Sequence, residues 1–170
     1  MLGLGISRRT KKSGLSSILL AECDNVNDFD YIYSCDKTLV TNNKLFGNGS
    51  LQFIKNSDVA GYFTLDITKN LNLSKHTSLK YSVYSANKSN IASISTTLFT
   101  STPYSYEHAF VYFVGWQLVN GWNTFNIPFT EFTKYGDETL STVKAVRFTV
   151  NLTVDNQTET VNFDRVQVLT

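Results

Sequence analysis

The chain is poor in the residues on which several common classes of protein depend. It has two cysteines, two histidines and two prolines in 170 residues, and charged residues make up only 17 % of it. Cys23 and Cys35 belong to no CxxC motif and have no histidine nearby, so a zinc site is not expected. Whether these two cysteines pair as a disulfide stays open at this point. No apolar run approaches the roughly 20 residues that a membrane helix needs.

Catalytic and targeting motifs are scarce as well. The sequence has no GxSxG turn, no phosphate-binding Gly-rich loop before a helix, and no metal-ligand spacing between His76 and His108. Its formal net charge of +1 gives no global field to attract nucleic acid or a membrane surface. The apolar run 18–21 is too short for the core of a signal peptide, so we expect assembly in the cytoplasm. We therefore predict a protein that is not an enzyme and that binds neither nucleic acid nor membrane.

Aromatic and small polar residues are abundant instead. The 12 Phe, 9 Tyr and 2 Trp supply a core and leave some rings for a surface, a composition that favours strands. From about residue 26 onward, apolar and polar residues alternate, as in Phe63, Leu65 and Ile67, and turn-forming residues separate the runs. No segment has sustained helical periodicity. The length suits one domain, so the pattern predicts a single all-β sandwich or barrel.

The last predicted strand contains a change of phase. Val161 and Phe163 lie on one face of a regular strand, whereas Val166 and Val168 fall on the other. A one-residue bulge near Asp164 and Arg165 would return both pairs to the core. The bulge would also point Asp164 in a specific direction.

Five short motifs, taken in order, resemble the galactose-binding-like jelly rolls of carbohydrate-binding modules. They are Asn27-Asp28-Phe29-Asp30, Gly47-Asn48-Gly49-Ser50-Leu51, Leu79-Lys80-Tyr81-Ser82-Val83, Gly121-Trp122-Asn123 with Pro128, and Phe163-Asp164-Arg165-Val166. The resemblance implies an all-β jelly-roll β-sandwich of two antiparallel sheets over residues 23–170. It also implies a domain that binds a ligand or is displayed as a building block, and that does not catalyse a reaction.

The same resemblance implies a structural calcium ion. Its ligands would come from Asp30, from a carbonyl near Gly47, and from Asp164. Two carboxylates with backbone carbonyls and water are chemically sufficient for calcium. The alternative is that both aspartates cap turns at strand ends and that the protein has no cofactor.

Sugar binding in this group of modules usually rests on exposed aromatic rings. The candidate glycan contacts are Tyr104, Tyr106 and Trp116, and the loop 102–108 is the most suggestive segment. Other candidate rings are Tyr84, Tyr112 and Trp122. The alternative is that these rings pack inside the sandwich, where Trp116 and Trp122 are expected.

Residues 1–22 differ from the rest and predict an extended N-terminal arm. The stretch has too little apolar mass to fold alone, and it carries the basic residues Arg8, Arg9, Lys11 and Lys12. Its first nine residues resemble the starts of virion proteins of tailed bacteriophages. This resemblance implies a non-enzymatic virion structural protein, either a capsid decoration, a head fibre or a tail fibre. The arm would bind other virion proteins, and a homo-oligomer would display the jelly roll toward host or mucosal glycans. The alternative is a free-standing carbohydrate-binding module.

Overall fold

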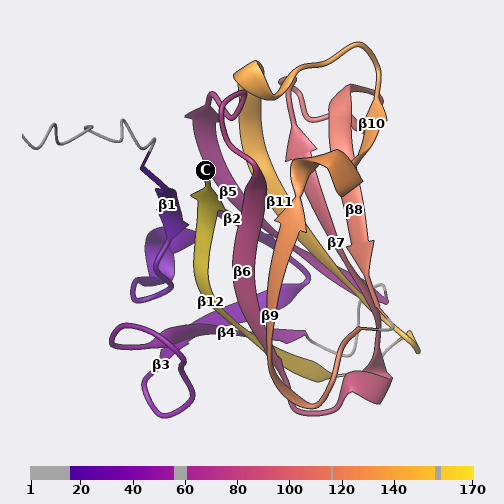
Figure 1. The fold of residues 1–170 in the computed structure, drawn as a ribbon. Helices are drawn as coiled ribbons and strands as arrows, with labels where there is room; N and C mark the ends of the chain where they lie inside the picture. The colour runs from indigo at the N-terminus through magenta and orange to yellow at the C-terminus, as the bar shows by residue number, and fades with distance from the viewer. Residues whose placement is uncertain (1–15, 56–60, 116, 156–157) are drawn as a thin grey trace, which may run out of the picture.

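Two antiparallel sheets pack face to face as a sandwich in the computed structural model, which describes residues 16–55, 61–115, 117–155 and 158–170 (Figure 1). The first sheet has the order β3-β4-β12-β6-β9, and β1 also pairs with β12. The second sheet has the order β10-β8-β7-β11-β5-β2. This arrangement confirms the predicted all-β jelly-roll sandwich of two antiparallel sheets.

The first sheet consists of β1 (Ile18–Ala21), β3 (Cys35–Val40), β4 (Ser50–Lys55), β6 (Ser78–Ser85), β9 (Gly121–Pro128) and β12 (Glu159–Leu169). The second consists of β2 (Tyr31–Tyr33), β5 (Tyr62–Leu71), β7 (Ile91–Phe99), β8 (Ala109–Val114), β10 (Thr133–Tyr135) and β11 (Val143–Leu152). Short 3-10 turns lie between the strands: η1 (Val26–Asp28), η2 (Lys88–Asn90), η3 (Tyr106–His108), η4 (Phe129–Glu131) and η5 (Leu140–Thr142). Within the described residues no helix is long and apolar enough to cross a membrane.

An aromatic cluster holds the two sheets together. Phe29, Phe53, Tyr81, Phe148 and Phe163 are fully buried and meet mostly edge to face, with ring centroids 4.9 Å apart for Tyr81 and Phe148. Each such side chain contributes roughly 1.5–3 kcal/mol by leaving water. Because side chains alternate along a strand, fixing these rings inside also fixes which residues face outward.

The predicted bulge in the last strand is present. The register of β12 against β6 shifts between Asp164 and Gln167, and Arg165 has a φ of 44°. Val161, Phe163, Val166 and Val168 are all fully buried as a result. The sequence pattern therefore located this irregularity correctly.

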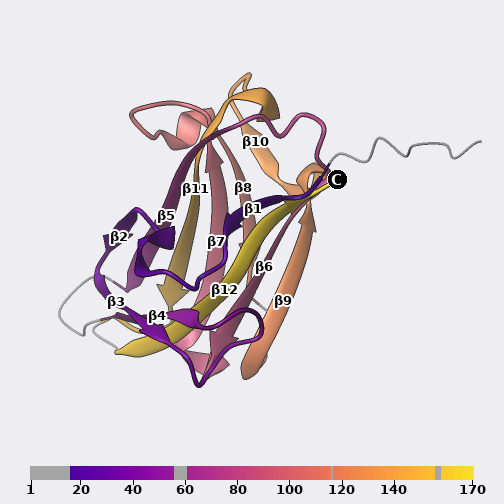
Figure 2. The same cartoon turned by 90° about the vertical axis from the view of Figure 1, so that its left-hand side faces the viewer.

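The predicted boundary between arm and domain lies too far along the chain. Residues 18–21 form β1, which pairs with β12, and Leu20 and Ala21 are only 2 % exposed (Figure 2). These residues complete the first sheet, so they belong to the sandwich. Arg8, Arg9, Lys11 and Lys12 lie outside the described residues.

The two cysteines are free thiols. Cys23 is buried, and burial raises its pKa well above the ordinary value for a thiol. Burial also raises the pKa of Cys35, to about 12. Both side chains are therefore protonated at neutral pH, and the question of a disulfide is answered in favour of two thiols.

Candidate functional site

The outward face of the second sheet carries rows of side chains that cross its strands. The strands pair in register, so residues on different strands line up at one level. The middle row is Tyr33, Thr64, Thr149, Ser95 and Phe113, on β2, β5, β11, β7 and β8. Neighbouring strands lie about 4.8 Å apart, so this row extends over roughly 19 Å. One continuous surface thus runs perpendicular to the strands.

Six exposed aromatic residues border this surface. They are Tyr31, Tyr33, Tyr62, Tyr106, Phe113 and Tyr135. The rings of Tyr33 and Tyr62 stack, with centroids 5.9 Å apart and planes 29° apart. Phe113 is 62 % exposed. Single exposed apolar residues are ordinary, but a contiguous group of exposed rings marks an interaction site.

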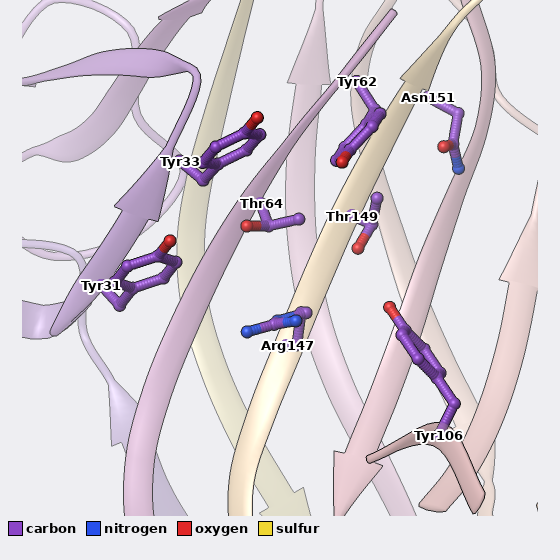
Figure 3. A pocket seen from close by; sticks show the side chains of 8 residues that line it. All are labelled: Tyr31, Tyr33, Tyr62, Thr64, Tyr106, Arg147, Thr149 and Asn151. Atoms are coloured by element: carbon purple, nitrogen blue, oxygen red, sulfur yellow. The ribbon is translucent and has the colours of Figure 1, made fainter. Parts of the chain in front are cut away.

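Two adjoining depressions hollow this surface. One of about 410 Å³ is lined by Tyr31, Tyr33, Tyr62, Thr64, Tyr106, Arg147, Thr149 and Asn151. The other, of about 500 Å³, is lined by Ser95, Tyr106, Glu107, Val111, Phe113, Tyr135, Thr149 and Asn151. They share Tyr106, Thr149 and Asn151, so we treat both as one groove. Figure 3 shows the first depression, with Tyr33 and Tyr62 on one side and Tyr106 across from them.

The loop 100–108 forms one wall of the groove. Tyr104 stacks on Phe99 with ring centroids 5.2 Å apart, and Tyr106 meets the same ring edge-on at 5.2 Å. Thr100 donates to the carbonyl of His108 through both its backbone N–H and its hydroxyl, which closes the loop. This packing leaves Tyr106 52 % exposed, while Tyr104 is half-buried.

The predicted glycan contacts are thus separated by the fold. Tyr106 lines the groove, Tyr104 packs below the wall, and Trp116 lies outside the described residues. The sequence-based candidates did not include Tyr31, Tyr33, Tyr62 or Phe113. The sequence indicates only that these residues lie on the outward face of their strands, because side chains alternate along a strand.

A neutral ion pair fixes the floor of the first depression. Arg147 donates from Nε and Nη2 to the two carboxylate oxygens of Asp66, at 2.7 Å each. Its guanidinium also lies 5.1 Å from the centroid of Phe99 and 5.9 Å from that of Tyr104. The hydrogen bonds to Asp66 raise the pKa of Arg147 above its ordinary value. The floor therefore offers rigid polar groups and little net charge.

Two hydroxyl groups on this face have no partner among the described residues. Thr149 Oγ1 and Thr97 Oγ1 are buried and make no hydrogen bond there. Leaving a buried polar atom unpaired costs about 1–3 kcal/mol. The side chain of Thr149 lines both depressions, so a rotation about its χ1 would turn this hydroxyl toward a ligand in the groove.

The outward face of the first sheet is arranged differently, because the loop 41–49 folds across it. Asp164 Oδ2 accepts hydrogen bonds from the backbone N–H groups of Leu45 and Phe46, at 2.6 and 2.8 Å. Trp122 donates from Nε1 to Asn43 Oδ1 at 3.0 Å and packs against Tyr84. Trp122 was expected in the core and instead lies on this outer face, where it holds the loop. Tyr112, by contrast, packs against the core beside Phe132.

The residues predicted to bind calcium are not brought together. Asp30 accepts the N–H of Thr68 at 2.6 Å, at the β2 edge of the second sheet. The acidic residue that lies beside the loop 41–49 is Asp24. Its carboxylate accepts the N–H groups of Asn48 and Gly49. Among the described residues no three His, Cys, Asp or Glu side chains form a group that could hold a metal.

Gly47 and Asp164 do lie at this loop. Gly47 has a φ of 55°, and a Cβ there would collide with the carboxylate of Asp24, so the position favours glycine. Asp164 Oδ1 is fully buried and makes no hydrogen bond within the described part of the chain. Burial raises the pKa of Asp164, and the nearby charge of Asp24 raises it further. The orphaned oxygen fits a cation held by Asp24 and Asp164, with carbonyls and water completing the shell.

Comparison with solved structures shows that the chain has the fold of carbohydrate-binding modules. The family 11 carbohydrate-binding module from Clostridium thermocellum, solved in complex with a β-1,3-1,4-mixed-linked tetrasaccharide, superposes with a TM-score of 0.68 at 14 % identity. The match covers 92 % of this chain and 97 % of that one. The family 30 module of a cellulosomal cellulase from the same organism gives a TM-score of 0.68 at 12 % identity, covering 92 % and 98 % of the two chains. An agarase gives 0.62 at 7 % identity, covering 92 % of this chain and 25 % of the enzyme.

Sequence comparison gives no comparable match. No family model matches the chain. No curated protein matches it either.

Proposed function

We propose that this protein is a glycan-binding module and that the groove on the second sheet is its binding site. The observation that carries the proposal is the row of exposed rings across the sheet, with polar side chains between them. Aromatic faces pack well against the C–H faces of sugar rings, and the hydroxyl of a tyrosine adds a polar end. Thr64, Thr149 and Asn151 can pair with sugar hydroxyls.

The groove suits binding better than catalysis. Most glycoside hydrolases place two carboxyl groups on either side of the scissile bond. The carboxylates nearest the groove are Glu107, which lines it, and Asp66, which is 1 % exposed and engaged by Arg147. A locked, paired carboxylate is poorly suited to proton transfer. The carbohydrate-binding modules with the same fold support the same reading.

A glycan array with the purified protein tests the proposal. We expect binding to at least one class of glycan, and a loss of roughly fivefold or more for Tyr33→Ala, because its exposed ring lines the first depression. Tyr84→Ala is the matched control, since Tyr84 lies on the other sheet. If the wild-type protein binds no glycan on the array, the proposal is wrong.

Calcium at the loop 41–49 is a second part of the proposal. Asp24 and Asp164 would hold the ion, which replaces the predicted set of Asp30, Gly47 and Asp164. The ion would neutralise the buried oxygen of Asp164 and so stabilise the loop. Its role would be structural, because the loop lies on the sheet opposite the groove.

The virion role stays a prediction. Residues 1–9, whose resemblance suggested it, and the predicted partner-binding residues Arg8, Arg9, Lys11 and Lys12 lie outside the described part of the chain. None of the solved structures named above is a virion protein. Anchoring to other virion proteins, homo-oligomerisation and location in a virion are likewise untested, and a free-standing module fits the groove equally well.

A further inference from the structure

We propose that the groove recognises a sugar that carries an acetamido group, as N-acetylated amino sugars do. The inference rests on the proposed glycan-binding function and specifies the ligand of the same site. It comes from a difference between the two halves of the groove, which meet at Tyr106, Thr149 and Asn151.

The half beyond Tyr106 is the apolar one. Phe113, Val111 and Tyr135 form its apolar lining, and Phe113 is the most exposed large apolar residue of the described chain. A bare hexose would bring hydroxyl groups here that lose water and gain few partners, which is unfavourable. A methyl group on the ligand would instead gain by leaving water.

Polar groups line the inner edge of this apolar half. Strand register places Ser95 directly between Thr149 and Phe113. Thr149 carries the buried hydroxyl that has no partner within the described residues. Asn151 donates from Nδ2 to Ser93 Oγ at 3.0 Å, which orients its amide and leaves Oδ1 as the acceptor. A group above Ser95 would therefore meet a donor and an acceptor on one side and an apolar ring on the other.

An acetamido group carries a methyl, an N–H and a carbonyl, which match the apolar ring, the acceptor and the donor of this part of the groove. Its methyl would pack against Phe113 and Val111, and its N–H would donate to Asn151 Oδ1. Its carbonyl would accept from the hydroxyl of Thr149 once that side chain turns about χ1 into the groove. A single group thus satisfies the orphaned hydroxyl and covers the exposed ring.

The charges of the groove argue against an acidic substituent in the same place. A carboxylate or sulfate needs an unpaired cation, but the guanidinium of Arg147 is engaged by Asp66. Glu107 also lines the apolar half and would repel an anion. A neutral acetamido group avoids both costs.

Isothermal titration calorimetry with chitotetraose and cellotetraose tests the inference. The two probes share a β-1,4-linked backbone and differ in the acetamido group at C2. Burying one methyl corresponds to about a fourfold gain in affinity, and the new hydrogen bonds add to it. We expect the wild-type protein to bind chitotetraose at least about fourfold more tightly than cellotetraose.

Two variants and a control assign the preference to the named residues. Phe113→Ala and Thr149→Val should each reduce the preference for chitotetraose over cellotetraose to below about twofold. Tyr84→Ala, on the other sheet, should keep the full preference. Equal affinity of the wild-type protein for the two probes would overturn the inference and leave the glycan-binding function intact. Binding to neither probe and to no glycan of an array would overturn both.

Discussion

The strands of both sheets alternate inward and outward residues, but the outward face of the first sheet is covered and that of the second is largely open. On the first sheet, Asp164 points outward and is nevertheless fully buried, because the loop 41–49 lies over it. On the second sheet, the loop 100–108 covers one part of the outward face. The strands β2 and β5 present open rings there, and β11 presents polar side chains beside them, as Figure 3 shows.

The difference teaches what each face does. On the covered face, Asp164 accepts backbone N–H groups of the loop and Trp122 donates to Asn43, so these side chains hold the loop in place. The open face keeps a group of exposed rings, on which the proposed glycan binding rests. Substitutions on the two faces should therefore separate stability from binding.

The largest expected loss of stability comes from the open face, because the ion pair between Arg147 and Asp66 there is structural. Arg147→Ala would leave the buried carboxylate of Asp66 without its partner, which costs about 3–5 kcal/mol in the free energy of unfolding. Urea denaturation measures this loss. The double variant Asp66→Ala/Arg147→Ala should recover much of it, since no charge is left unpaired. A loss below about 1 kcal/mol for the single variant would show that solvent screens the pair.

Removal of β1 should have the next largest effect. A chain that begins at residue 23 loses the pairing with β12 and the buried side chain of Leu20, which costs about 2–3 kcal/mol. A chain that begins at residue 16 keeps β1 and should match the full-length protein in urea denaturation. Equal stability of the two truncated chains would contradict the assignment of residues 18–21 to the sandwich.

On the covered face, Asp164→Ala should lower the free energy of unfolding by about 2 kcal/mol, because the N–H groups of Leu45 and Phe46 lose their acceptor. Asp164→Asn keeps an acceptor oxygen and should lose less. Thermal or urea unfolding measures both variants. Glycan affinity should stay within about twofold of wild type in each, and a large loss of affinity would mean that the two faces are coupled.

The smallest expected change in stability is the one caused by pH and by calcium. The pKa of Asp164 is raised above its ordinary value of 3.8, so the folded protein holds this proton more tightly than the unfolded chain. In chelator, the contribution of Asp164 to stability should therefore fall as the pH rises from about 3.8 through the raised pKa. Calcium at about ten times its dissociation constant should add about 1.4 kcal/mol.

Asp164→Asn is the control for this prediction, because it removes the titrating group. The variant should lose both the calcium effect and this part of the pH dependence in thermal unfolding. An unchanged melting temperature of the wild-type protein in calcium and in chelator would count against a bound ion.

The sequence predicted the fold well because a sandwich core imposes a strict alternation. Even the bulge between Val161 and Val168 could be predicted, since only an extra residue returns both pairs to the core. The site was harder to predict. Tyr33 and Tyr62 alternate like any strand residue, and whether their face is open depends on where the distant loops 41–49 and 100–108 fold.

The acidic residue that lies beside the loop 41–49 was hard to predict for a related reason. Asp30 and Asp24 are both acidic residues near the opening strands, and the sequence does not say which one reaches the loop that contains Gly47. Cys23, next to Asp24, has a positive φ. This backbone conformation depends on tertiary packing and cannot be predicted from the local sequence. Tyr106 was predicted because loop aromatics are visible as such in the sequence.

The central claim is that the open face of the second sheet binds glycan. Its most direct test is a titration of the isotope-labelled protein with the tightest-binding glycan, followed by backbone amide chemical shifts. We predict that the shifts which change lie along β2, β5, β11, β7 and β8, around the groove. Changes confined to the first sheet and the loop 41–49 would contradict the account.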